Sequence, residues 1–168
     1  LVRALGQQMF FLKRFHCGPH PGNFAFRPDG SVIIYDFGGV KTLSTDLVER
    51  FKALVRAGRQ HDIPVIEQHL MALDALAEQG KFPVELYQQW LEVLLRPLTT
   101  QYDFAENSAH HDGVILVKKS LKYWDTFKPS PDTLMVNRTI SGHYWNLIHL
   151  KVDDNLNDLF EELVPPLS

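Results

Sequence analysis

The chain has 168 residues, of which 45% are hydrophobic, and this length fits one domain with its own buried core. Its formal net charge of -3 argues against a broad basic surface, so nucleic acid is not an expected partner. A single cysteine, Cys17, excludes an internal disulfide and suits a reducing compartment. No apolar run approaches the ~20 residues that a membrane-spanning helix needs.

An amphipathic helix is predicted over residues 1–14, because Leu1, Leu5, Met9 and Leu12 recur at helical spacing. The loop that follows contains two prolines and two glycines between residues 16 and 22. That density is incompatible with an α-helix and favours one particular backbone path.

A β-hairpin is predicted next, with strands at residues 24–27 and 32–35 on either side of a Pro-Asp-Gly-Ser turn. Gly30 would supply the positive φ that this turn needs. The hairpin should fold Asp36 back toward Asn23.

The rest of the chain is predicted to be helical, since apolar residues recur at helical spacing and Pro or Gly marks most of the segment ends. The predicted helices are one capped at residues 44–46, one from Pro64 to Gly80, one from Pro83 to Pro97, one carrying Val114–Trp124 and one carrying Ile140–Ile148, with a short acidic segment around residues 156–160. The apolar positions of these helices include Trp90, Trp124 and Trp145, which are predicted to lie in the core.

The main functional signal is the pair Asn23 and Asp36, whose side chains offer the oxygen ligands that a magnesium ion on nucleotide phosphates prefers. Protein kinases place an Asn five positions after the Asp of a His-Arg-Asp loop, and an Asp-Phe-Gly turn follows across a hairpin. His16, Asn23 and the Asp36-Phe37-Gly38 turn match this arrangement. Asn23 and Asp36 are the predicted metal ligands, and Phe37 and Gly38 complete the predicted cofactor site.

Residues 15–23 read Phe-His-Cys-Gly-Pro-His-Pro-Gly-Asn, which resembles the loop of the UbiB/AarF (ADCK-type) family of atypical protein-kinase-like proteins. That family usually has Phe-His-Ala-Asp-Pro-His-Pro-Gly-Asn. The resemblance covers residues 8–60 and, more loosely, a later helix where Arg138 and Gly142 fit an Arg-x-x-x-Gly pattern. It implies a mainly α fold with one short β-hairpin, the C-terminal lobe of a protein-kinase-like fold, over residues 1–168. The chain starts within a helical pattern, so we expect a fragment of a longer protein whose N-terminal lobe is absent.

One position departs from the family. Gly18 stands where the family and kinases in general carry the catalytic Asp. We expect His16 to hydrogen-bond backbone near the Asp-Phe-Gly turn, by the general rule that buried polar groups find partners. His20 is the candidate for a contact to the transferred phosphate. The catalytic set is thus His16, His20 and the altered position Gly18.

The resemblance implies a nucleotide- and magnesium-binding lobe of an atypical kinase or ATPase linked to ubiquinone or prenyl-lipid metabolism. The implied cofactors are ATP and magnesium. The implied partners are ATP or a related nucleotide, the N-terminal lobe, and a membrane or prenyl lipid, with a cytoplasmic location peripheral to the inner membrane. Whether the protein is an enzyme stays open, because the catalytic Asp is missing.

Two alternatives remain. The first is a pseudokinase scaffold without catalysis. The second is an aminoglycoside-type phosphotransferase, a class that shares a His-Gly-Asp-x-x-x-x-Asn loop but usually lacks Phe-Gly after the metal-binding Asp.

Overall fold

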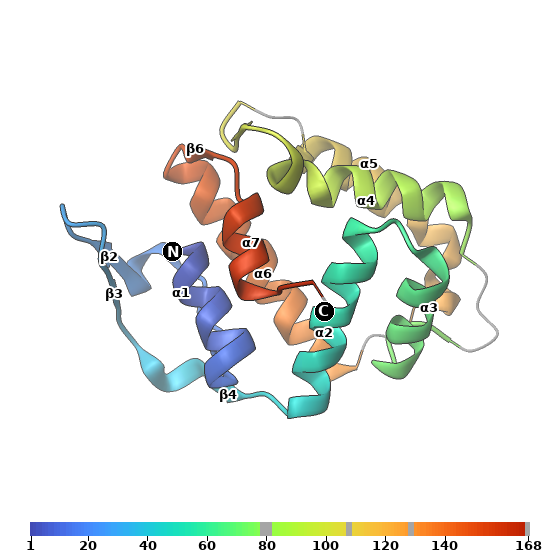
Figure 1. The fold of residues 1–168 in the computed structure, drawn as a ribbon, viewed down its shortest axis with the longest axis horizontal. Coiled ribbons are helices and arrows are strands. Elements are labelled where there is room, and N and C mark those ends of the chain that lie inside the picture. The colour runs from blue at the N-terminus through green and yellow to red at the C-terminus, as the bar shows by residue number, and fades with distance from the viewer. Residues whose placement is uncertain (78–81, 107–108, 128–129, 167–168) are drawn as a thin grey trace.

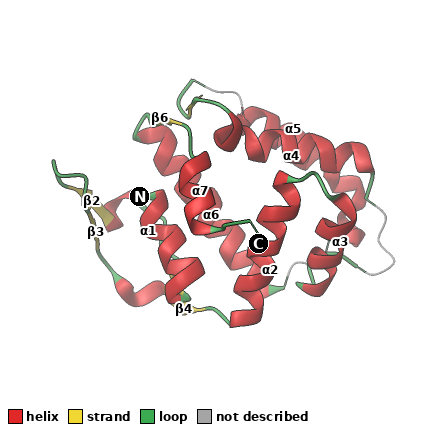
Figure 2. Cartoon of the chain, viewed as in Figure 1, coloured by secondary structure: helices red, strands yellow, loops and turns green. Residues whose placement is uncertain are grey.

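The computed structural model describes residues 1–77, 82–106, 109–127 and 130–166 (Figure 1). Helices dominate these parts of the chain, and the strands form short antiparallel pairs (Figure 2). The α-helices are α1 (Val2–Gln7), α2 (Thr45–Arg59), α3 (Ile63–Ala72), α4 (Val84–Thr99), α5 (Ala109–Ser120), α6 (Pro131–His149) and α7 (Asn157–Leu163). The strands are β1 (Arg14–His16), β2 (Phe24–Phe26), β3 (Val32–Ile34), β4 (Val40–Thr42), β5 (Tyr102–Asp103) and β6 (Asp153–Asp154). Among the described residues, no helix combines the length and the apolar character that a bilayer crossing requires.

The helix expected over residues 1–14 changes from an α-helix to a π-helix and ends at Leu12. After α1 the chain continues over Gln8–Leu12 as a π-helix, and Lys13 then adopts a left-handed conformation with φ of 53°. Arg14 already belongs to β1. Turns of π-helix are rare and often lie at functional sites, and this one directly precedes the candidate loop.

The predicted hairpin is present as β2 and β3, with Phe24 opposite Ile34. Gly30 has φ of 82°, the positive value expected for its place in the turn. Two further antiparallel pairs, β1 with β4 and β5 with β6, were not predicted, because strands of two or three residues carry no readable alternation. The prediction of a mainly α fold is confirmed, although the described residues contain three short antiparallel strand pairs and not one.

The cap of α2 is one of the predicted candidates. Ser44 is the N-cap, and its Oγ accepts a hydrogen bond from the backbone N–H of Leu47 at 3.1 Å. Asp46, another of the predicted caps, lies in the first turn of the helix and forms an ion pair with Arg50 one turn later.

Two helices end at places other than those predicted. α3 begins beside Pro64 as expected but ends at Ala72, because the backbone turns at Asp74, where φ is 53°. Gly80, the predicted end, lies outside the described residues. α4 runs through Pro97 to its last turn at Thr99.

The helix predicted to carry Val114–Trp124 is divided: α5 stops at Ser120, and 3₁₀ turns cover Leu121–Thr126. The prediction of a core position was wrong for two tryptophans, since Trp124 is 70% exposed and Trp145 is 44% exposed. Both lie on helical faces that turn away from the core. Trp90 is half-buried, and its indole N–H donates to Ser120 Oγ at 3.2 Å.

Buried apolar side chains form three clusters that hold the helices together. The first joins the N-terminal helix to α2, α6 and α7 and includes Phe10, Phe15, Val48, Val136 and Leu163. The second joins α2, α3, α4 and α5 and includes Ala57, Ile66, Leu91 and Leu116. The third surrounds β5 and the end of α6 and includes Tyr102, Phe104, Leu147 and Leu156.

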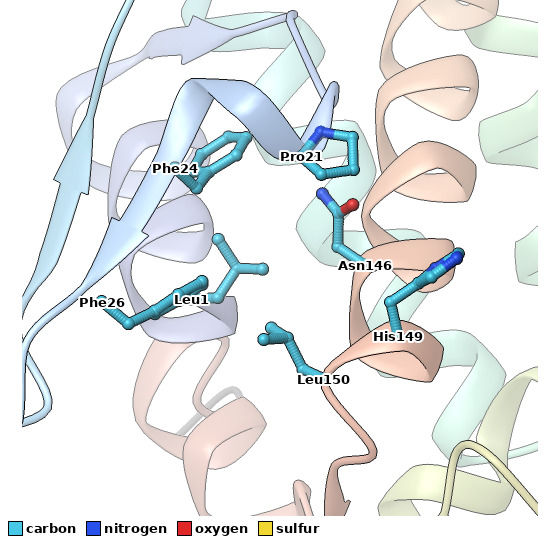
Figure 3. Close-up of a pocket in the computed structure, with 7 residues that line it drawn as sticks. All are labelled: Leu1, Pro21, Phe24, Phe26, Asn146, His149 and Leu150. Carbon is cyan, nitrogen blue, oxygen red and sulfur yellow. The ribbon is translucent and has the colours of Figure 1, made fainter.

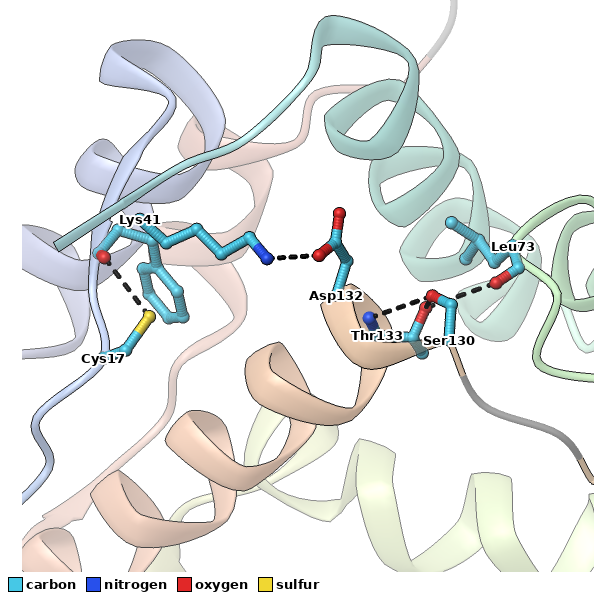
Figure 4. A network of polar contacts seen from close by, with 7 residues as sticks. Cys17, Lys41, Leu73, Ser130, Asp132 and Thr133 are labelled. Atoms are coloured by element: carbon cyan, nitrogen blue, oxygen red, sulfur yellow. Dashed lines mark hydrogen bonds and ion pairs between the residues drawn. The ribbon is translucent and has the colours of Figure 1, made fainter. Parts of the chain in front are cut away.

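Polar contacts fix the start of α6, the helix that later reaches the candidate site (Figure 4). Ser130 caps it, with Oγ accepting the N–H of Thr133 at 3.3 Å. Thr133 Oγ1 donates to the carbonyl of Leu73 at 3.4 Å, which ties α6 to the end of α3. Lys41 on β4 forms an ion pair with Asp132. α6 is therefore held in a defined orientation between β4 and α3.

Candidate functional site

The candidate site lies between two chain segments that β1 and β4 hold side by side. Phe15 pairs with Lys41, and the N–H of Cys17 donates to the carbonyl of Gly39 at 2.9 Å. The loop that starts at Cys17 and the turn that ends at Gly39 are therefore fixed to each other at one end.

His16 is buried, with 1% of its surface exposed, and it fixes the turn that contains Asp36. Its Nε2 lies 2.9 Å from the carbonyl oxygen of Asp36 and 3.2 Å from that of Tyr35. Because both partners are acceptors, Nε2 carries the hydrogen and donates. This is the backbone contact expected from the sequence. The N–H of His16 donates to Gln8 Oε1 at 3.0 Å, a contact that the sequence analysis missed because a Gln on an amphipathic helix carries no distinguishing pattern.

Asn23 closes a single 3₁₀ turn, Pro21–Asn23, within the segment expected to contain no helix. Its Nδ2 donates to the carbonyl of Gly18 at 3.2 Å. Because the nitrogen end of the carboxamide is engaged, Oδ1 is the end left for a cation. His20 is the N-cap of the same turn: its side chain is exposed, and Nδ1 accepts the N–H of Gly22 at 3.1 Å.

Asp36 has left-handed backbone angles, φ of 54° and ψ of 78°. Asp is among the few non-glycine residues that adopt this region, and the hydrogen bond from His16 to its carbonyl holds it there. Asp36 Oδ1 accepts the N–H of Gly38 at 3.2 Å. No described residue binds the second carboxylate oxygen, Oδ2. Asp36 and Gly38 are both exposed, and Phe37 is 65% exposed, so the whole turn faces outward.

The hairpin brings Asn23 and Asp36 to the same end of the loop. The carbonyl of Asn23 accepts the N–H of Tyr35 at 2.8 Å, so Asp36 follows directly after the residue that pairs with Asn23. A carboxamide oxygen and a carboxylate oxygen form a hard-ligand set of the kind that magnesium prefers beside phosphate and water. The residues present therefore fit a magnesium-nucleotide complex. Within the described ranges, no group of three or more His, Cys, Asp or Glu side chains could hold a metal ion.

Position 18 has little room for a side chain. A Cβ on Gly18 would lie 2.9 Å from Asn23 Nδ2 and 3.1 Å from His16 Cε1. Because Gly18 has no side chain, the Asn23 amide can approach the loop backbone closely. His16, Gly18, Asn23 and Asp36 form one connected group, as the motif spacing predicted, and His20 lies at its exposed edge.

The helical architecture, the hairpin and the buried histidine beneath an Asp-Phe-Gly turn define this protein as a kinase-like C-terminal lobe. A family model described as the ABC1 atypical kinase-like domain matches residues 1–99. The chain belongs to this family of atypical kinase-like proteins, which confirms the resemblance to the UbiB/AarF proteins.

Individual relatives agree with this assignment. The chain is 38% identical over 66 residues to the Arabidopsis thaliana chloroplast protein named Activity of BC1 complex kinase 7, and the match covers 39% of this chain and 10% of that protein. Among solved structures, the complex of Rv3197 with erythromycin from Mycobacterium tuberculosis superposes with a TM-score of 0.67 at 19% identity. That superposition covers 98% of this chain and 43% of the mycobacterial chain, so the fold is shared well beyond residue 99. The chain spans a tenth of the plant relative and less than half of the mycobacterial one.

Proposed function

We propose that Asn23 and Asp36 hold a magnesium ion on the phosphates of ATP or a related nucleotide, and that this lobe is the metal-binding half of a nucleotide site. The hydrogen bond from Tyr35 N–H to the Asn23 carbonyl carries the proposal, because it fixes the two ligand-bearing residues side by side. The site is completed by the N-terminal lobe of the full-length protein.

Each residue of the site has a defined part in this proposal. Asp36 presents Oδ2 to the cation, while the N–H of Gly38 holds Oδ1 and so orients the carboxylate. Asn23 presents Oδ1 while its nitrogen stays on Gly18. A bound magnesium ion neutralises phosphate charge, the main requirement of phosphoryl transfer. His20, exposed at the edge of the loop, is placed to contact a phosphate oxygen.

The missing carboxylate at Gly18 favours a second candidate function, a nucleotide-responsive pseudokinase. General-base assistance is worth ~10²- to 10⁴-fold in rate, so its loss slows transfer without removing nucleotide binding. In the first reading the intact protein is a weak ATPase or phosphotransferase connected with ubiquinone or prenyl-lipid metabolism at a membrane. In the second it acts on partner proteins without turnover.

The metal ligands can be tested by calorimetric titration of the full-length protein with ATP, in the presence of magnesium and in EDTA. Asp29→Ala is a matched control for Asp36→Ala, because Asp29 Oδ1 also accepts the N–H of the residue two positions later, Ser31, at 2.9 Å, but at the tip of the hairpin. We expect Asp36→Ala to lose magnesium-dependent affinity at least ~10-fold, equivalent to ~1.4 kcal/mol. Asp29→Ala should bind like the wild type. Equal wild-type affinity with and without magnesium would refute the proposal.

Turnover in Gly18→Asp and Gly18→Ala separates the two readings. Both variants introduce the Cβ that crowds Asn23, but only Gly18→Asp restores a carboxylate. Turnover that appears in Gly18→Asp alone indicates a degenerate catalytic site, and turnover already present in the wild type indicates an enzyme. Retained nucleotide binding with no turnover in any variant indicates a pseudokinase.

A further inference from the structure

The candidate loop is attached to a helix that lies far away in the sequence. Asn146 on α6 donates from Nδ2 to the carbonyl of Pro19 at 2.9 Å, across 127 positions of the chain. Asn146 is 6% exposed, so this hydrogen bond is shielded from water. Figure 3 shows its carboxamide rising from α6 toward the loop, beside Pro21 and below the hairpin residue Phe24.

Pro19 is in turn linked through Gly18 to Asn23, a predicted metal ligand. The carbonyls of Gly18 and Pro19 belong to neighbouring peptide units, and the ring of Pro19 fixes φ between them, so the position of one carbonyl restricts the other. The Gly18 carbonyl accepts Nδ2 of Asn23, which sets the direction of Asn23 Oδ1. Two hydrogen bonds and the backbone between Gly18 and Pro19 thus connect Asn146 with Asn23.

His143 fixes the orientation of Asn146. The Asn146 amide nitrogen also lies 3.2 Å from His143 Nδ1, so its two hydrogens are directed at Pro19 and at the imidazole. This requires a neutral ring whose Nδ1 accepts. Burial, together with the nearby His16, lowers the pKa of His143 to about 4, which keeps the ring neutral. The rings of His143 and Phe24 also pack in a T-shaped arrangement, with centroids 5.1 Å apart.

A glycine allows α6 to come this close. A Cβ on Gly142 would lie 2.4 Å from Pro19 Cγ and 2.6 Å from Pro19 Cβ, distances that real Cβ atoms essentially never show. Gly142, His143 and Asn146 share one face of α6, because residues three and four positions apart on a helix are neighbours. The loop therefore rests directly on the helix.

We propose that Asn146 is a positioning residue of the nucleotide site: through the carbonyls of Pro19 and Gly18 it orients the Asn23 carboxamide toward the cation. This inference rests on the proposed function of Asn23. Asn146 touches neither cation nor nucleotide, and it lies outside the 1–99 range matched by the family model. The second half of the chain thereby takes part in metal binding.

The test uses the full-length protein with Asn146→Asp, which keeps the size of the side chain but replaces the donor with an acceptor facing the Pro19 carbonyl. Asn146→Leu, of similar volume and without charge, is a second variant in case the buried carboxylate prevents folding. Thr139→Val is the matched control, because Thr139 is also buried on α6 and its Oγ1 bonds to Met135 of its own helix at 2.9 Å.

Two measurements are made on each variant. The first is ATP affinity with magnesium and in EDTA. We expect both Asn146 variants to bind ATP about 10-fold more weakly in the presence of magnesium, with a change of less than about twofold in EDTA. Thr139→Val should leave the ATP affinity unchanged in both conditions. An equal loss in both conditions would overturn the positioning role, because it would indicate general damage to the site.

The second measurement is amide hydrogen exchange over residues 17–23 without nucleotide, which is independent of the proposed function. Faster exchange in the Asn146 variants, with no change in Thr139→Val, supports the attachment of the loop to α6. Unchanged exchange overturns the inference. A wild type with no magnesium dependence would instead overturn the proposed function, and the exchange result would still decide whether Asn146 holds the loop.

Discussion

Replacing Gly142 by Ala is the sharpest test of the packing between α6 and the loop. The new Cβ would overlap two ring carbons of Pro19, at 2.4 and 2.6 Å. Overpacking a well-filled contact costs ~1–3 kcal/mol, and this overlap belongs at the upper end because the proline ring cannot rotate away. Ala gains ~1 kcal/mol over Gly in a helix. The net expectation is a loss of ~1–2 kcal/mol in the free energy of unfolding.

Gly113→Ala is the matched control, since Gly113 also lies within a helix, α5, and a Cβ there would meet nothing within 4 Å. This variant should gain ~0.5–1 kcal/mol from helix propensity alone. Urea unfolding of the full-length protein, monitored by circular dichroism, measures both changes. The reasoning is refuted if Gly142→Ala is as stable as Gly113→Ala, because α6 would then not approach Pro19 as closely as the structure shows.

Two further predictions concern a helix cap and a buried histidine. Ser44→Ala should lower the free energy of unfolding by ~1 kcal/mol, because Leu47 N–H loses its acceptor, and unfolding of Thr45→Ala, next to the cap, provides the comparison. The pKa of His143 is about 4 in the folded protein against an ordinary 6.5, so the unfolded chain takes up the proton first. The free energy of unfolding should therefore fall by up to ~3 kcal/mol as pH decreases from about 6.5 to about 4. His143→Gln should show a flatter pH dependence over that range, and an unchanged slope would contradict the assignment.

Strong local signals made most of the fold predictable. Gly30 and its turn sequence determined the hairpin, and Ser44 determined the start of α2. The errors came from tertiary effects that no window of sequence contains. α3 ends at Ala72, before the predicted glycine, and the apolar spacing of Trp124 gives no information about which helical faces find a partner.

In the site, too, local sequence predicted some residues, while tertiary contacts determined others. Motif spacing grouped His16, Asn23 and Asp36, and backbone hydrogen bonds place these residues in adjoining segments because the hairpin between them is short. Asn146 could not be found in this way, since its partner is 127 positions away and a helical Asn has no pattern of its own. The Arg-x-x-x-Gly match pointed to Gly142, but only the close approach to Pro19 gives that glycine a physical reason.

The composition of the loop explains why it depends on distant side chains. Pro19 and Pro21 have no N–H, so the segment has few donors with which to satisfy its own carbonyls. Two carboxamides supply the missing hydrogens: Asn23 donates to the carbonyl of Gly18, and Asn146 donates to that of Pro19. One of these two donors, Asn23, is itself a predicted metal ligand. Loss of the Asn146 carboxamide should therefore weaken magnesium binding before it lowers the stability of the fold as a whole.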